Sequence, residues 1–184
     1  MRRRALLASI PLAATGGCTI GSERPDIEGL QLSSPALDGE TLPRRYSCDG
    51  AGISPPLRIE GVPEVAASIA IVGEWLRSYT PQTIWLLWGI PAEPSIELPE
   101  GIPPDRRPDS PTSAVHGSND EGEIGYRPPC HETPGRNEYR FNVYALESPL
   151  SIEGGADRDV FDEALATLAT GYDVLERQRL EPHH

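Results

Sequence analysis

The stretch Tyr-Arg-Phe-Asn-Val-Tyr-Ala at residues 139–145 decides the fold class, because its side chains alternate in character. Successive side chains of a β-strand point to opposite faces of the sheet. One face of this stretch carries Tyr139, Phe141, Val143 and Ala145, and the other carries Arg140, Asn142 and Tyr144. The alternation predicts a strand with one apolar face towards a core.

Two further strands are predicted upstream, at residues 68–72 and 83–88. Both are short apolar runs, rich in β-branched or aromatic residues and bounded by proline and glycine. Runs of this kind are typical of strands that are buried on both faces. We expect them to be central strands.

A segment rich in proline separates these runs from the stretch at 139–145. Its prolines within 93–118 are Pro94, Pro99, Pro103, Pro104, Pro108 and Pro111. Proline cannot donate to a sheet ladder and breaks helices. The density predicts a long, mostly irregular surface loop, either functional or a tolerated insertion.

Near the C-terminus the apolar residues recur at steps of three and four, which predicts an amphipathic helix. The apolar positions are Phe161, Leu165, Leu168, Tyr172 and Leu175. Acidic residues crowd the expected first turns, where they suit the helix dipole, and Gly171 inside the pattern indicates close packing or a bend. Strands followed by a helix predict an antiparallel or mixed sheet with a helix at one edge.

The N-terminus reads as an export signal. Arg2, Arg3 and Arg4 precede an apolar run at 5–14, followed by Thr15-Gly16-Gly17-Cys18. The run is too short for the roughly 20 residues that cross a bilayer, and the paired arginines suit twin-arginine export. We predict a signal peptide at 1–17, a lipid on Cys18, a lipidated tether at 18–28 and one domain at 29–182. The alternative is an ordinary signal cleaved nearby.

The composition indicates an exported, acidic protein. All 28 acidic residues follow Cys18, but only 13 of the 16 basic ones do, and every basic residue is arginine. Such a charge disfavours nucleic acid and anionic lipid surfaces as partners. A lysine-free acidic chain also suits a halophilic organism, where molar salt screens surface repulsion.

No motif for catalysis or for a cofactor is visible. The chain lacks a Gly-x-Ser-x-Gly elbow and a glycine-rich phosphate loop. His116 and His131 lie inside the domain, and a second pair, His183 and His184, forms the tail. The spacing of Cys48, Asp49, Cys130 and His131 does not fit a zinc motif, so no metal is expected. Cys48 and Cys130 would instead form a disulfide in an oxidising compartment, or remain two separate thiols.

The motifs around the two cysteines resemble the phosphatidylethanolamine-binding protein (PEBP) family, and more narrowly its bacterial and archaeal Raf-kinase-inhibitor-like branch. The matching stretches are Tyr46-Ser47-Cys48-Asp49-Gly50, Ile53-Ser54-Pro55-Pro56-Leu57, Gly125-Tyr126-Arg127-Pro128-Pro129-Cys130 and the strand at 139–146. The resemblance covers nearly the whole mature chain in order. It implies a mainly β fold, an antiparallel β-sandwich with a C-terminal helix, and here a long proline-rich loop.

The family pocket binds anions such as phosphate groups, and the resemblance places its lining on specific residues. These are Trp75, Ile84, Trp85, Gly125, Tyr126, Pro129, Cys130, Asn137 and Tyr139. The family's Asp-Pro-Asp-x-Pro loop falls on 75–79, and its two histidines fall on Ile84 and Asn137. Pro128 stands where the family has glycine, which removes one backbone donor. Arg77 or Arg127 could supply a guanidinium instead. We therefore predict a degenerate, more apolar pocket with weak or absent phosphate binding.

These observations leave several functions open. We expect a non-catalytic, membrane-tethered binding protein for a small molecule, a lipid head group or a partner protein. The alternatives are an inhibitor of an exported serine protease, since the resemblance implies relatives in the family that restrain serine proteases or kinases, and a scaffold without a ligand. An enzyme is disfavoured because no nucleophile–base pair is visible.

Overall fold

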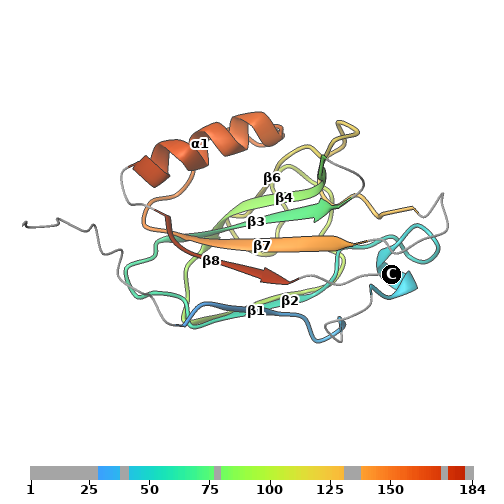
Figure 1. Ribbon diagram of the computed structural model, residues 1–184, viewed down its shortest axis with the longest axis horizontal. Coiled ribbons are helices and arrows are strands. Elements are labelled where there is room, and N and C mark those ends of the chain that lie inside the picture. The colour runs from blue at the N-terminus through green and yellow to red at the C-terminus, as the bar shows by residue number, and fades with distance from the viewer. Residues whose placement is uncertain (1–28, 38–41, 77–79, 131–137, 171–173, 181–184) are drawn as a thin grey trace, which may run out of the picture.

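Two antiparallel sheets and one helix make up the fold in a computed structural model (Figure 1). It describes residues 29–37, 42–76, 80–130, 138–170 and 174–180. The predicted signal peptide, Cys18 and the whole tether therefore lie outside the described residues. None of the described helices is long and apolar enough to cross a membrane.

The smaller sheet has the strand order β1-β2-β5. Its strands are β1 (Gln31–Ser33), β2 (Leu57–Glu60) and β5 (Ser95–Leu98). Side chains of β2 and β5 alternate between buried and exposed, as expected for a sheet with one face in a core and the other in solvent. A 3-10 turn, η1 (Arg44–Tyr46), lies between β1 and β2 in the chain.

The larger sheet has the strand order β6-β4-β3-β7-β8, and all of its pairings are antiparallel. Its strands are β3 (Ser68–Trp75), β4 (Gln82–Pro91), β6 (Val115–His116), β7 (Tyr139–Leu146) and β8 (Val174–Leu180). The three predicted strands are confirmed as β3, β4 and β7, which lie side by side. Every residue of β3 is buried, which confirms that it is a central strand.

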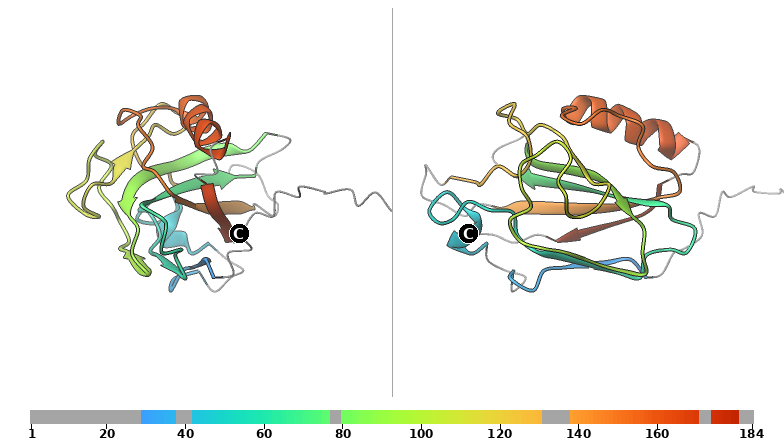
Figure 2. Two further views of the ribbon diagram at one scale, coloured as in Figure 1. Left: turned by 90° about the vertical axis from the view of Figure 1, so that its left-hand side faces the viewer. Right: turned by 180° about the vertical axis from the view of Figure 1, so that it is seen from behind.

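The alternation at 139–145 separates two cores, one on each side of the larger sheet. Tyr139, Phe141, Val143 and Ala145 pack between the sheets against Ile59 and its neighbours. On the opposite side, Tyr144 packs in a second cluster that includes Phe161 of the helix α1 (Arg158–Thr170). On the polar side of the predicted strand, Asn142 and Tyr144 are therefore buried as well and Arg140 is half-buried, because α1 covers this side (Figure 2).

The helix begins where its acidic residues predict. The Asp157 carboxylate accepts a hydrogen bond from the backbone N–H of Val160 at 3.0 Å, which caps the first turn. Phe161 is fully buried, and its ring centroid lies 5.9 Å from that of Trp88. The helix thus covers a face of the larger sheet rather than an edge, which corrects the expected placement.

The predicted end of the helix is wrong. Helix α1 ends at Thr170, and Leu175 lies in β8, which pairs with β7. Leu175 continues the helical spacing by coincidence, whereas β8 satisfies backbone groups of β7 that would otherwise form a sheet edge. Gly171 and Tyr172 lie outside the described residues.

The proline-rich segment is more regular than predicted. Residues 93–118 contain β5 and β6, and Ile96, Leu98 and Val115 are buried. Both strands are at sheet edges, where neighbouring prolines are tolerated. The irregular part is confined to 99–114, and the stretch 103–107 within it is exposed.

Candidate binding site

The predicted pocket residues gather at one end of the larger sheet, where β3 ends and β4 and β7 begin. Trp75, the last residue of β3, lies opposite Gln82 on one side and Tyr139 on the other. The segment 125–130 joins them, because the Arg127 N–H donates to the carbonyl of Ile84 at 2.7 Å. The structure brings together Trp75, Ile84, Trp85, Gly125, Tyr126, Pro129, Cys130 and Tyr139. Asn137 lies outside the described residues.

Aromatic rings pack against one another at this end. The ring centroids of Trp75 and Tyr139 are 6.2 Å apart, and Trp85 meets Tyr126 edge to face at 5.8 Å. Trp75, Trp85 and Tyr139 are at most 2% exposed. Ile84, at the position of the family's first histidine, is fully buried in the same core. Two of the positions where the family has acid–base groups, Trp75 and Ile84, are therefore part of the packing.

The segment 119–125 is held in place by Asn119, which is buried. Its side-chain oxygen accepts hydrogen bonds from the N–H groups of Glu121 at 3.0 Å and Glu123 at 3.2 Å. Gly125 has φ +87°, and a Cβ there would lie 3.0 Å from the Cα of Pro104. Glycine is required because that backbone conformation is costly for other residues. This bend positions Tyr126 over Trp85.

A disulfide joins Cys48 to Cys130 beside the aromatic rings, with the two Cα atoms 5.2 Å apart. The backbone adds a hydrogen bond from the Cys48 N–H to the carbonyl of Pro129 at 3.2 Å. The Tyr126 hydroxyl donates to the carbonyl of Tyr46 at 2.7 Å. Three links therefore connect the turn after η1 to the segment 125–130. Burial raises the pKa of Tyr126 and that of Tyr139 well above the usual phenol range, so both stay protonated.

The guanidinium of Arg127 is engaged rather than freely solvated. Its Nη2 lies 2.8 Å from a carboxylate oxygen of Glu121, and the Arg127 side chain is 21% exposed. Its Nη1 is buried without a hydrogen-bond partner among the described residues. The positive charge at this end is therefore balanced by a neighbouring carboxylate, and the two N–H donors of Nη1 have no partner among the described residues. Arg77 lies outside the described residues.

His116 lies deeper, next to Trp85, with ring centroids 6.4 Å apart. Its Nδ1 is 2.9 Å from the carbonyl oxygen of Asp105, so that nitrogen carries the proton. Burial lowers the pKa of His116, which keeps the imidazole neutral. Its Nε2 has no hydrogen-bond partner among the described residues. The described part of the chain holds no group of three metal-ligating residues, and His131 lies outside it.

Sequence reasoning missed Gln82, Glu121 and Tyr46 as parts of this site. Gln82 opens β4 opposite Trp75, and its side-chain oxygen is buried without a partner among the described residues. Glu121 pairs with Arg127 across the bend at Gly125. Nothing in the spacing of these residues predicts the contacts. Tyr46 opens one of the matching motifs, and that motif is the signal that could have found it.

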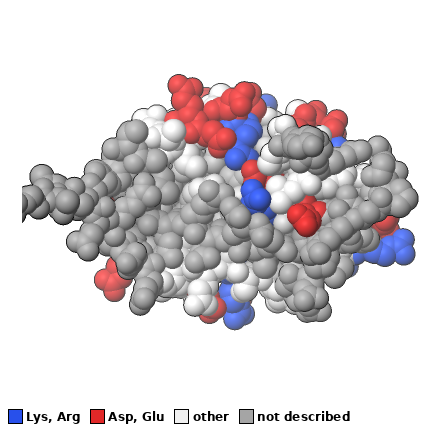
Figure 3. All heavy atoms as spheres, in the orientation of Figure 1, with Lys and Arg blue, Asp and Glu red and all other residues white. Residues whose placement is uncertain are grey.

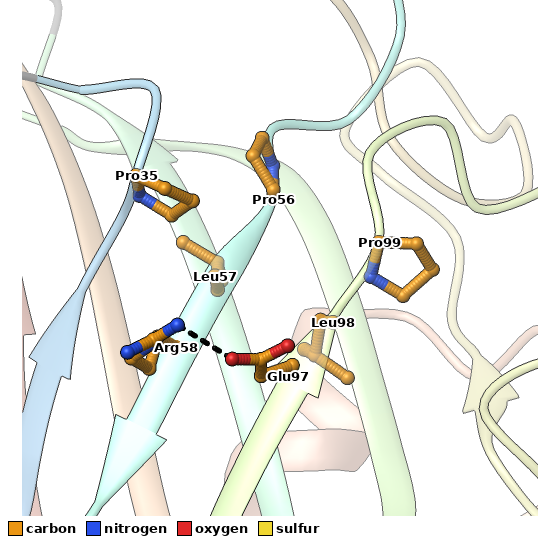
Figure 4. A pocket seen from close by; sticks show the side chains of 7 residues that line it. All are labelled: Pro35, Pro56, Leu57, Arg58, Glu97, Leu98 and Pro99. Carbon is orange, nitrogen blue, oxygen red and sulfur yellow. Dashed lines mark hydrogen bonds and ion pairs between the residues drawn. The ribbon is translucent and has the colours of Figure 1, made fainter.

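A separate surface pocket of about 320 Å³ lies on the smaller sheet (Figure 4). Its lining residues are Pro35, Pro56, Leu57, Arg58, Glu97, Leu98 and Pro99. An ion pair between Arg58 Nη2 and Glu97 Oε1, 2.6 Å apart, crosses it. Both side chains are well exposed, so the pair contributes little energy. This pocket contains none of the predicted site residues.

The arrangement of two sheets and one covering helix matches known proteins. A family model described as phosphatidylethanolamine-binding protein matches residues 32–176. The chain belongs to the phosphatidylethanolamine-binding protein family. This PEBP member is 38% identical over 151 residues to a UPF0098 protein of Pyrococcus horikoshii, covering 81% of this chain and 74% of that protein. A UPF0098 protein of Pyrococcus abyssi is 37% identical over 143 residues, with 75% and 78% covered.

Solved PEBP structures share the fold. A crystal structure of a PEBP homolog from Chlamydia trachomatis superposes with a TM-score of 0.69 at 31% identity, covering 84% of this chain and 96% of that chain. YbcL of Escherichia coli, described as a member of the mammalian PEBP family, gives a TM-score of 0.71 at 24% identity, with 84% and 97% covered. The second likeness supports the fold alone. Together they confirm the expected antiparallel fold with its C-terminal helix.

Proposed function

We propose that this PEBP member is an exported, lipid-anchored binding protein that acts without catalysis on the outer face of the cell membrane. The sequence pattern at the N-terminus supports the location, because it predicts a signal peptide at 1–17, a lipid on Cys18, a tether at 18–28 and a domain at 29–182. The acidic, lysine-free composition suits a salty exterior. The Cys48–Cys130 disulfide suits an oxidising one.

One observation carries the binding proposal: the family's histidine and acidic positions that the structure describes, Ile84 and Trp75, carry no proton-transfer group, and the guanidinium of Arg127 is charge-balanced. Ile84 and Trp75 fill positions where the family places a histidine and an acidic loop, and both are buried. Arg127 is paired with Glu121. An anion would have to compete with that carboxylate, whereas an uncharged acceptor could bond the free Nη1 without adding charge. The site therefore favours an uncharged small molecule or head group over phosphate and phosphomonoesters such as phosphoethanolamine.

Calorimetry tests this preference. Titrating phosphate and phosphoethanolamine into the purified domain should give no saturable heat below millimolar concentration. Micromolar affinity for either would overturn the proposed preference. Turnover of ester or phosphoester substrates that is lost on His116→Ala would overturn the non-catalytic part.

The location is tested separately. The wild-type chain should fractionate with membranes and carry a lipid-modified Cys18 by mass spectrometry. The Cys18→Ala variant should appear in the soluble fraction. A wild-type protein found soluble and unmodified would contradict the anchor, whatever the site binds.

An inhibitor of an exported serine protease is the second candidate, and the stretch 103–107 favours it. This exposed stretch is braced at its base, because the His116 N–H donates to the carbonyl of Arg106 at 3.0 Å and the His116 ring bonds the carbonyl of Asp105. A preorganised segment loses less entropy on binding. Arg107 is exposed, so a protease that cleaves after arginine is the natural target to assay. Equal residual protease activity with wild type and Arg107→Ala would remove this candidate. If neither a ligand nor a protease target is found, a scaffold without ligand binding is the remaining candidate.

A further inference from the structure

The described chain begins at one end of the sandwich. Gly29 packs on Gly61, since a Cβ on Gly29 would lie 3.2 Å from the Gly61 carbonyl oxygen. Strand β1 then starts opposite Glu60. Glu60 pairs with Ser95 of β5. Ser95 follows Pro91 by only four residues, and Pro91 pairs with Ser68 at the start of β3. We call this the tether end.

The candidate site lies at the opposite end of the same strands. Strand β3 runs for eight residues from Ser68 at the tether end to Trp75 at the site. At a rise of about 3.3 Å per residue, the two ends are about 23 Å apart along the strand. Figure 1 shows the start of β1 at the left and η1, beside the site, at the right. We call the end that carries Trp75 the site end.

The last described strand finishes at the site end. Strand β8 pairs with β7 from Val174 opposite Leu146 to Leu180 opposite Phe141. Phe141 lies two residues after Tyr139 in the site. The chain therefore enters the described domain at the tether end and leaves it at the site end.

We infer that the site end faces away from the membrane that holds the lipid, so its ligand arrives from the aqueous side and is not a head group of that membrane. This inference rests on the proposed lipid anchor at Cys18. Gly29 follows Cys18 by eleven positions, a stretch of chain that spans at most about 38 Å. Bringing the site to the bilayer would require the tether to run back along about 23 Å of sheet, which uses more than half of that reach.

The charge of the domain does not pull the site end towards the membrane. The mature chain carries 28 acidic and 13 basic residues, so an anionic bilayer repels the domain as a whole. Acidic side chains gather over α1 on the side shown in Figure 3. At the tether end, Glu60, Glu64 and Glu93 are exposed. The lipid alone holds this end near the membrane, and the domain stands off from the surface.

Trp88 lies in the half of β4 nearer the tether end and is replaced by Phe in every form. Energy transfer from tryptophan to dansyl head groups in phosphatidylcholine vesicles then measures the orientation, because the remaining Trp75 and Trp85 lie at the site end. Two matched forms of the Cys18→Ala chain are anchored to the same nickel-chelating lipid. One carries hexahistidine in place of residues 1–17, and the other carries it after His184. We expect several-fold stronger transfer from the C-terminally anchored form. The native lipidated chain should match the N-terminally anchored form.

Equal transfer from the two forms, or stronger transfer from the N-terminal anchor, would overturn the inferred orientation. If the lipid anchor is absent, the fractionation experiment shows it, because the native chain is then missing from the membrane fraction. The tagged forms still report which end faces the vesicle in that case. The two failures are therefore distinguishable.

Discussion

Trp75 lies opposite Tyr139 across the pairing of β3 with β7, and their ring centroids are 6.2 Å apart. Trp75 occupies the first position of the segment where the family has its acidic loop. A bulky indole there fills space next to the tyrosine, and both side chains are at most 2% exposed. The site end is consequently part of the hydrophobic core, which links its binding behaviour to the stability of the domain.

Replacing Trp75 should therefore cost stability as a core residue does. Trp75→Ala should lower the free energy of unfolding by about 3–5 kcal/mol, the range for truncating a buried tryptophan. Trp75→Phe keeps a ring and should cost clearly less. Urea denaturation of both variants measures the difference. A loss under about 1 kcal/mol for the alanine variant would mean that the indole is not packed.

The disulfide should stabilise the domain by constraining the unfolded chain. Cys48 and Cys130 are 82 residues apart, and closing a loop of that length contributes about 4 kcal/mol in the chain-entropy model. The double variant Cys48→Ser/Cys130→Ser should lose about that amount in urea denaturation. Non-reducing peptide mapping should recover the two cysteines in one linked pair. Two free thiols titrated in unreduced wild-type protein would contradict the bond.

The stability of the domain should fall on mild acidification because of His116. Burial holds the pKa of His116 below its unfolded value of about 6.5. The neutral imidazole therefore contributes stability that is complete above pH 6.5 and declines as the pH falls below it towards the folded pKa. Protonation would also add a second N–H at Nε2, for which the described residues offer no acceptor.

Urea unfolding at pH 7.5, 6.5 and 5.5 checks this pH dependence. Wild type should lose more stability between pH 6.5 and 5.5 than His116→Gln, which cannot titrate. Parallel losses in the two proteins would assign the pH dependence to other groups.

An ion cluster under α1 holds the helix to the larger sheet. The Glu74 carboxylate is buried, and it lies 2.9 Å from both Arg158 Nη1 and the Asn142 amide and 3.6 Å from Arg140. Glu74→Gln leaves two guanidinium groups without that carboxylate. We expect a loss of about 3 kcal/mol, the low end for breaking a buried pair.

Asp162→Asn is the matched control for this cluster. Asp162 is exposed and pairs with the same Arg158, at 2.7 Å and four residues along the helix. Its loss should cost only about 0.5 kcal/mol. Equal costs for the two variants in thermal unfolding would mean that burial of Glu74 adds nothing.

The central strands could be predicted because their signals are local. The apolar runs at 68–72 and 83–88 and the alternation at 139–145 lie within single elements, and each element is buried as its pattern requires. Strand β8 could not be predicted, because Leu175 fits the helical spacing and only the pairing with β7 selects a strand. Strand β5 could not be predicted because prolines flank it. Proline excludes a central strand but is tolerated next to an edge strand.

The motifs predict where the candidate site lies, but they do not predict how its charged side chains pair. The motif positions bring Trp85, Tyr126 and Tyr139 to one end of the sheet. The pairing of Arg127 with Glu121 depends on the bend at Gly125, and no sequence spacing encodes that contact. Whether an arginine is solvated or paired is a property of the folded loops.

Calorimetric titration of phosphoethanolamine into wild type and Glu121→Gln tests the central claim most directly. The claim is that the site end lacks anion affinity because the charge of Arg127 is balanced by Glu121. Wild type should show no saturable heat, Glu121→Gln should gain measurable affinity, and Glu121→Gln/Arg127→Gln should lose it again. Micromolar binding by wild type, or no gain in Glu121→Gln, would contradict the account.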